Sequence, residues 1–170
     1  MRKEILLTSR DMLPVREKAE HELYEYRKQE ITSRAEFYTC YAAFYEISPG
    51  KANYPYHYHT ASTELFYIIG GEGILETPEG EKRVKAGDVI VCPPGERAAH
   101  LLRNPSETET LSYLDVDTVQ SPEEMCIRDR VPARPTRRNL WRSAALRYRR
   151  EIRLQNGRFS GCSETRRPQL

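Results

Sequence analysis

The chain has 170 residues, a formal net charge of +2 at pH 7, 38% hydrophobic residues and 9% aromatic residues. This length allows about one domain with a modest hydrophobic core. No apolar run approaches the roughly 20 residues of a membrane-spanning helix, so we expect no such helix. The apolar run Ile5, Leu6 and Leu7 near the N-terminus is too short for a secretory signal.

The near-neutral total combines two segments of opposite charge. Residues 1–125 contain 14 Lys and Arg against 22 Asp and Glu, whereas residues 126–170 contain 13 Arg, no Lys and three acidic residues. We therefore predict an acidic globular part followed by a separate arginine-rich tail, residues 119–170.

The four cysteines, Cys40, Cys92, Cys126 and Cys162, are widely spaced and form no C-x-x-C pair. A disulfide framework needs a denser set of cysteines in a short secreted chain. The sequence therefore predicts reduced, mostly buried thiols in a cytoplasmic protein.

The N-terminal segment, residues 1–33, is predicted to be an arm outside the main domain. Its apolar residues Val15, Ala19, Leu23 and Tyr26 have helical spacing, and the residues around them are rich in Glu, Lys and Arg. This pattern favours a short amphipathic helix or, alternatively, an irregular arm.

From residue 34 the chain consists of short aromatic and β-branched runs separated by turn residues. The predicted strands cover residues 36–47, 64–69, 73–76, 82–85, 89–92, 100–103 and 110–116. Residues 77–80, T-P-E-G, predict a hairpin turn. A series of short strands without a strong helix predicts an all-β fold, an antiparallel sandwich or barrel, over residues 34–118.

Three of the four histidines lie within this series of strands. His57 and His59 are two residues apart, so both side chains point to the same face of a strand. Glu64 begins the next predicted strand, and His100 lies within reach on a neighbouring antiparallel strand. Three imidazoles and one carboxylate suit a divalent transition metal and leave two positions of an octahedral ion for water or substrate. The alternative is a set of solvated polar side chains or a satisfied buried network.

The same residues carry a family resemblance. The segment from His57 to Gly71, H-x-H, four residues, E, six residues and G, resembles the first motif of the cupin superfamily. The segment from Gly87 to Asn104, with P-P-G and H-x-x-x-N, resembles the second motif, although four residues separate Gly95 from the histidine where the general motif has two. The resemblance covers residues 34–117 and is greatest to small single-domain bacterial cupins.

The resemblance implies a jelly-roll β-barrel, often a homodimer, with one metal inside. In this chain the metal ligands would be His57, His59, Glu64 and His100, and the ion would be Fe(II), Mn(II), Ni(II) or Zn(II). Cupins include dioxygenases, sugar-phosphate isomerases, decarboxylases, storage proteins and ligand sensors, so the fold does not fix the function.

Two further residues are predicted to contact a substrate. Phe66 shares strand parity with Glu64, and Tyr113 shares it with Asp115, which places both on the predicted inner face. Core packing alone is the alternative explanation for each of them. No second carboxylate or histidine of the cavity stands out as a catalytic base.

The sequence leaves two function classes open. The first is a metal-dependent isomerase or dioxygenase acting on a small polar ligand. The second is a non-catalytic module that binds or senses a carbohydrate or carboxylate, and a structural role without metal is a third alternative. We expect a small-molecule ligand and a homodimer, with no membrane or nucleic acid as partner.

The tail carries a resemblance of a different kind. Residues 124–130, E-M-C-I-R-D-R, back-translate to a string similar to a transposase mosaic-end adapter used in sequencing libraries. We therefore interpret residues 119–170 as a non-native or disordered tail, from a chimeric or out-of-frame translation, outside the fold. The alternatives are an arginine-rich arm that binds nucleic acid, with helix-like spacing from Leu140 to Ile152, or a natural tail without an assigned role.

Overall fold

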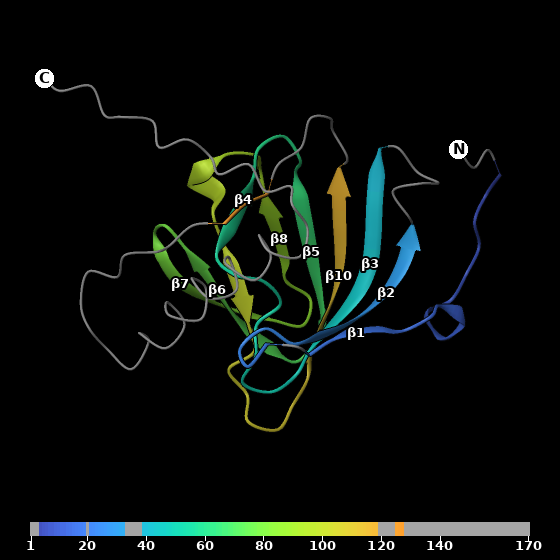
Figure 1. Ribbon diagram of the computed structural model, residues 1–170, viewed down its shortest axis with the longest axis horizontal. Helices are drawn as coiled ribbons and strands as arrows, with labels where there is room; N and C mark the ends of the chain where they lie inside the picture. The colour runs from blue at the N-terminus through green and yellow to red at the C-terminus, as the bar shows by residue number, and fades with distance from the viewer. Residues whose placement is uncertain (1–3, 20, 33–38, 119–124, 128–170) are drawn as a thin grey trace, which may run out of the picture.

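A computed structural model describes residues 4–19, 21–32, 39–118 and 125–127 (Figure 1). Two short 3₁₀ helices, η1 (Arg10–Met12) and η2 (Glu96–Ala98), accompany the strands in these ranges. The strands are β1 (Arg16–Lys18), β2 (Tyr26–Thr32), β3 (Cys40–Ile47), β4 (His57–His59), β5 (Glu64–Gly70), β6 (Glu72–Thr77), β7 (Gly80–Lys85), β8 (Val89–Cys92), β9 (Leu101–Arg103), β10 (Leu111–Thr118) and β11 (Met125–Ile127). The described ranges contain no α-helix, and the predicted all-β fold is confirmed.

The largest sheet has the strand order β1-β2-β3-β10-β5-β8, and every paired neighbour in it is antiparallel. Figure 1 shows β10 between β3 and β5, at the middle of this sheet. A three-stranded sheet has the order β7-β6-β9, and the predicted hairpin turn joins β6 to β7 with Thr77 opposite Gly80. A two-stranded sheet pairs β4 with β11.

The core lies on the inner face of the large sheet, where β3, β5, β8 and β10 alternate between buried side chains and more exposed ones. In β3 the buried positions are Tyr41, Ala43, Tyr45 and Ile47. In β10 they begin with Leu111 and Tyr113, which are apolar, and end with two aspartates. The inner face of β10 therefore passes from hydrophobic core to polar site along one strand.

Two glycines at the start of β6 are needed for different reasons. Gly71 has a φ of +78°, and a Cβ there would lie 2.6 Å from the carbonyl oxygen of Thr110. Gly73 lies inside β6 rather than in a turn, and a Cβ there would lie 2.9 Å from Leu111 Cδ2. Close packing against β10, not a turn conformation, therefore explains the second glycine.

The N-terminal segment is neither the amphipathic helix nor the separate arm that the sequence favoured. After the single turn η1 it forms β1 and β2, and β2 pairs antiparallel with β3, with Tyr26 opposite Ile47. By pairing with the otherwise open edge of β3, β2 provides hydrogen-bond partners for its backbone N–H and C=O groups. The free energy gained from this pairing outweighs the weak helix propensity of the segment. None of the helices in the described part of the chain has the length and apolar character to cross a bilayer.

Of the predicted tail, only Met125–Ile127 is described, and these residues form β11 against β4. This pairing corrects the prediction that nothing after residue 118 joins the fold. The rest of the adapter-like segment and the span from Leu140 to Ile152 lie outside the described residues. Cys40 and Cys92 are free thiols as predicted, whereas Cys126 is disulfide-bonded, which corrects the prediction of a reduced thiol there.

Candidate metal centre

Backbone pairing holds two of the predicted ligands side by side. The N–H of His57 donates to the carbonyl of His100 at 3.0 Å, and the N–H of His100 donates back to the carbonyl of His57 at 2.8 Å. This isolated antiparallel bridge brings β4 against the start of β9. The two imidazole centroids lie 4.7 Å apart, and both side chains are buried.

A backbone carbonyl two residues earlier in the chain orients each of these rings. His57 Nδ1 lies 2.8 Å from the carbonyl oxygen of Pro55, and His100 Nδ1 lies 2.9 Å from that of Ala98. A carbonyl oxygen only accepts, so each Nδ1 carries the donated hydrogen. In the neutral rings, Nε2 then keeps its lone pair, which is the arrangement of histidines that bind metal ions.

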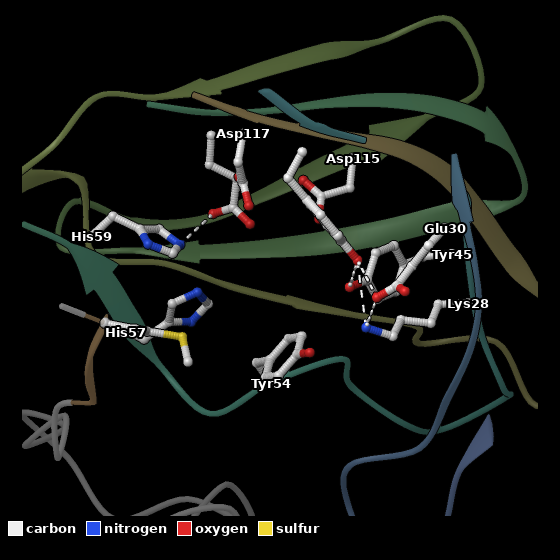
Figure 2. A pocket seen from close by; sticks show the side chains of 11 residues that line it. Lys28, Glu30, Tyr45, Tyr54, His57, His59, Asp115 and Asp117 are labelled. Atoms are coloured by element: carbon white, nitrogen blue, oxygen red, sulfur yellow. Dashed lines mark hydrogen bonds and ion pairs between the residues drawn. The ribbon is translucent and has the colours of Figure 1, made fainter. Parts of the chain in front are cut away.

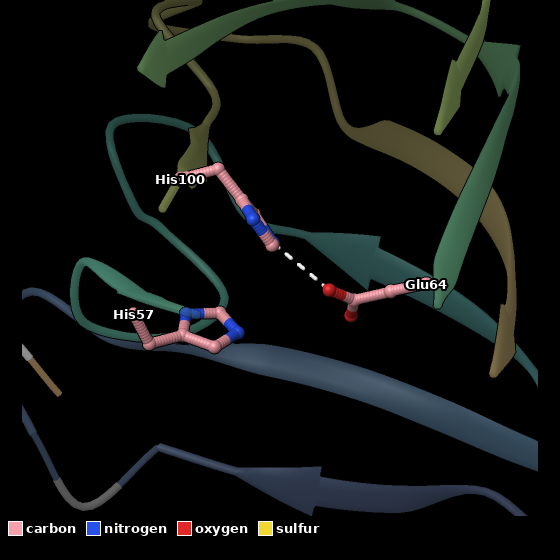
Figure 3. A group of neighbouring side chains, drawn as sticks. All are labelled: His57, Glu64 and His100. Atoms are coloured by element: carbon pink, nitrogen blue, oxygen red, sulfur yellow. Dashed lines mark ion pairs between the residues drawn. The ribbon is translucent and has the colours of Figure 1, made fainter. Parts of the chain in front are cut away.

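Glu64, at the start of β5, faces both rings (Figure 3). One ligand atom from each of His57, Glu64 and His100 lies within 4.8 Å of the others. His100 Nε2 and Glu64 Oε2 are 2.9 Å apart, yet their approach lacks the direction of a hydrogen bond, and neither atom has another hydrogen-bond partner. Buried polar atoms without a partner are costly, and a cation between them would satisfy both. The residues therefore fit a metal ion.

A second group of candidate ligands shares Glu64 with the first. His59, Glu64 and Asp117 also place one ligand atom each within 4.8 Å, and His59 Nε2 lies 3.5 Å from Glu64 Oε2. Asp117 stands directly opposite Glu64 in the pairing of β10 with β5. The structure thus gathers the three predicted histidine ligands around Glu64, the fourth, and adds one aspartate that the sequence analysis missed.

Asp115 is a second carboxyl group of the site that the sequence analysis did not recognise, since it found no candidate base. Alternation along β10 from Leu111 places both Asp115 and Asp117 on the buried face, and this signal was available in the sequence. Asp115 is buried, and its Oδ1 has no hydrogen-bond partner. Burial, together with the neighbouring charges of Glu64 and Asp117, raises the pKa of Asp115 well above its usual range.

The ionisation of the histidine–glutamate group follows from the same contacts. Burial, helped by the neighbouring His100, lowers the pKa of His57 to about 3. Burial also acts to raise the pKa of Glu64, but the facing His100 and His59 outweigh it and lower that pKa. Burial opposes charge on His100, whereas Cys92 and Glu64 raise its pKa well above the usual value. Without a cation, Glu64 and His100 therefore form a buried ion pair.

The site opens into a cavity of about 310 Å³, a size suited to a small ligand (Figure 2). His57, His59, Glu64 and Asp117 line one end, and Figure 2 shows Asp115 between Asp117 and Glu30. The opposite end of the cavity is lined by side chains of β2 and β3, namely Lys28, Glu30, Tyr41 and Tyr45. Figure 2 shows Tyr54 between the histidines and Lys28.

Phe66 and Tyr113, the predicted substrate contacts, pack behind the metal centre and are not among the residues that line this cavity. The Phe66 ring lies 5.7 Å from the His100 ring and 5.1 Å from the Tyr113 ring, both edge to face. The Tyr113 hydroxyl accepts a hydrogen bond from Asn53 Nδ2 at 2.9 Å. Both side chains are buried and support His100 from the core side.

Comparison with known proteins agrees with this architecture, since residues 43–117 match the cupin domain family. These residues form a cupin domain. None of the curated proteins matches the chain.

Among solved structures, the chain resembles three bacterial proteins in fold. The polyketide cyclase RemF from Streptomyces resistomycificus is 18% identical, with a TM-score of 0.63 over 84% of this chain and 99% of that one. A sugar phosphate isomerase of the cupin superfamily from Silicibacter pomeroyi is 18% identical, with a TM-score of 0.62 over 71% and 80%. A predicted oxalate decarboxylase from Thermotoga maritima is 22% identical, with a TM-score of 0.59 over 68% and 100%. At these identities the similarity establishes the fold and leaves the reaction open.

Proposed function

We propose that this cupin holds one divalent transition metal ion, Fe(II), Mn(II), Ni(II) or Zn(II), between His57, His59, Glu64 and His100. The observation that carries the proposal is the close approach of two buried atoms, His100 Nε2 and Glu64 Oε2, neither of which has a hydrogen-bond partner. Beside them lies the imidazole of His57, whose Nδ1 hydrogen is donated to a backbone carbonyl. Asp117 is a further candidate ligand through its group with His59 and Glu64.

We further propose that the protein is an enzyme that converts a small polar ligand, and that isomerisation is favoured over oxygenation. When bound, the metal ion would act as a Lewis acid toward a carbonyl or hydroxyl oxygen of the ligand. Asp115 lines the same cavity with a buried carboxyl oxygen that has no hydrogen-bond partner, and it is the residue placed to hold or move a proton of that ligand. Isomerisation through an enediol moves a proton between neighbouring carbons and uses a group such as this carboxyl, whereas oxygenation does not need one.

The first experiment measures metal in the full chain purified without chelators. We expect close to one equivalent of a divalent transition metal by mass spectrometry of the digested protein, and its loss in His57→Ala. The exposed substitution Lys82→Met should keep the metal. Full metal content in His57→Ala contradicts the proposed ligand set.

The second experiment separates the classes of activity. The metal-loaded protein is incubated with free and phosphorylated aldoses and ketoses, in air and without oxygen. Isomer formation without oxygen supports the proposal, whereas oxygen consumption supports a dioxygenase. Ligand-dependent melting shifts without any product support the binding or sensor module instead.

We also propose that the protein forms a homodimer, in the cytoplasm, through the outer face of β5 and β8. Tyr67, Ile69, Val89 and Val91 are 40–59% exposed on these two strands, and Tyr67 stands opposite Val89 in their pairing. Adjacent exposed apolar side chains of this kind are typical of protein interfaces. Sedimentation of the full chain should give a dimer, and Val91→Lys a monomer; a monomeric parent protein contradicts the proposal.

A further inference from the structure

The end of the cavity opposite the metal centre is lined by charged and phenolic side chains that are hydrogen-bonded to one another. Lys28 Nζ donates to Glu30 Oε1 at 2.7 Å and to the hydroxyl of Tyr41 at 3.4 Å. The other oxygen of Glu30, Oε2, lies 3.2 Å from Arg16 Nη1. The Tyr41 and Tyr45 hydroxyls are 3.4 Å apart. These contacts fix Lys28 and Glu30 in place at the cavity wall without any ligand.

The charge of the cavity disfavours an anionic ligand group at this end. Among the described residues that line the cavity, apart from the histidines, Lys28 is the single cation. The carboxyl groups of Glu30, Glu64, Asp115 and Asp117 line the same cavity. A phosphate or a second carboxylate near Lys28 would also meet Glu30, which already occupies the ammonium group.

The hydrogen-bonding groups at this end match hydroxyl groups. An ammonium group only donates and a carboxylate only accepts, whereas a hydroxyl does both. A ligand hydroxyl placed beside the Lys28–Glu30 pair can accept from the first and donate to the second without breaking the pair. Phosphate and carboxylate oxygens can only accept. The rings of Tyr41, Tyr45 and Tyr54 supply apolar surface for the C–H groups between such hydroxyls.

We propose that the Lys28 end of the cavity binds the hydroxyl groups of an uncharged polyhydroxylated ligand, such as a free aldose or ketose, and discriminates against its phosphate ester. This inference rests on the proposed function, because the carbonyl end of the same ligand would lie at the metal centre. The proposed substrates are therefore free sugars and not sugar phosphates.

The test compares D-ribose with D-ribose 5-phosphate, which differ only at the end remote from the carbonyl. Saturation-transfer NMR titrations use the zinc-loaded full chain. We expect the dissociation constant of D-ribose to be at least about tenfold lower than that of the phosphate ester. Inorganic phosphate should not displace the sugar. Tighter binding of the phosphate ester, or no binding of D-ribose, overturns the proposal.

Variants at the Lys28 end locate the binding. Lys28→Met and Tyr41→Phe should each weaken D-ribose binding, the first by about tenfold because a hydrogen bond to a charged group is lost. Both variants should keep the metal content of the parent protein, and Lys82→Met should bind D-ribose normally. If Lys28→Met does not fold, Tyr41→Phe, which retains the ring, decides the matter. Unchanged affinity in the folded variants contradicts the proposal.

The same titrations on metal-free protein keep the two proposals apart. Lys28 belongs to neither of the two ligand groups, so its effect on D-ribose binding should persist without zinc. A protein that takes up no metal, but whose D-ribose binding falls in Lys28→Met, contradicts only the proposed function. A protein with full metal and no such fall contradicts only this inference.

Discussion

The two ends of the cavity are built in different ways. At the metal end, His57 and His100 are each oriented by the carbonyl two residues earlier in the chain, through Pro55 and Ala98. At the opposite end, Lys28 is held by side chains of its own strand and the adjacent strand, and its place depends on the pairing of β2 with β3. Local contacts therefore orient the two imidazole rings, whereas tertiary pairing alone places Lys28. The two ends should respond differently to substitution.

The largest expected effect is at Glu64, because it belongs to both groups of candidate ligands. Glu64→Gln keeps the shape of the side chain and removes its charge. We expect metal affinity to fall by about 100-fold or more, measured by competition with a chromophoric chelator. The exposed Glu79→Gln should leave the affinity unchanged. A Glu64→Gln protein with parental affinity would show that the two groups are not a metal centre.

The two groups at the metal end can be ranked by separate substitutions. His57 has a ring fixed by its backbone hydrogen bond, whereas Asp117 enters only through the second group. His57→Ala should lower metal affinity by about 100-fold and Asp117→Asn by about tenfold, in the same chelator assay. A larger loss in Asp117→Asn would move the ion toward His59 and away from His100.

The pH dependence of metal binding tests the ion pair at the metal end. In the metal-free protein the pKa of His100 is raised above its usual value, so its ring stays protonated at a higher pH than a free imidazole does. This proton must leave before Nε2 binds a cation. Apparent affinity should therefore rise with pH until the raised pKa of His100 is passed. His57, with a pKa of about 3, is already neutral and adds no dependence near neutral pH.

Calorimetry of zinc binding in buffers of different ionisation enthalpy checks this directly. We expect release of close to one proton per ion below the raised pKa of His100. Lys28→Met, at the opposite end of the cavity, should give the same proton release. Binding without proton release, or with affinity that falls as pH rises toward neutrality, contradicts the predicted ionisation of the pair.

The smallest expected effect is behind the metal end, at Tyr113. Tyr113→Phe removes the hydroxyl that accepts from Asn53 and leaves that amide without this partner. The free energy of unfolding should fall by about 1–2 kcal/mol in urea titrations, while metal content stays constant. Lys82→Met, an exposed substitution outside the site and the proposed dimer interface, is the control and should change neither quantity. A loss of metal in Tyr113→Phe would make this residue part of the site.

Much of the fold and of the metal end could be predicted from the sequence. Short alternating runs predicted the antiparallel strands of the cupin domain, and the spacing of His57 and His59 placed two imidazoles on one face. Phe66 was correctly assigned to the buried face, but parity alone could not show that it lies behind His100 instead of along the cavity.

What the sequence by itself determined is the local part of this protein: which runs form strands, and that His57 and His59 share one face of a strand. Only the tertiary structure decided that β2 joins the large sheet, that Lys28 reaches the cavity, and that Asp117 stands beside Glu64. The physical reason is that a strand has two equivalent faces until its neighbours are known. A polar residue in it becomes part of a site only when long-range pairing makes its face the inner one.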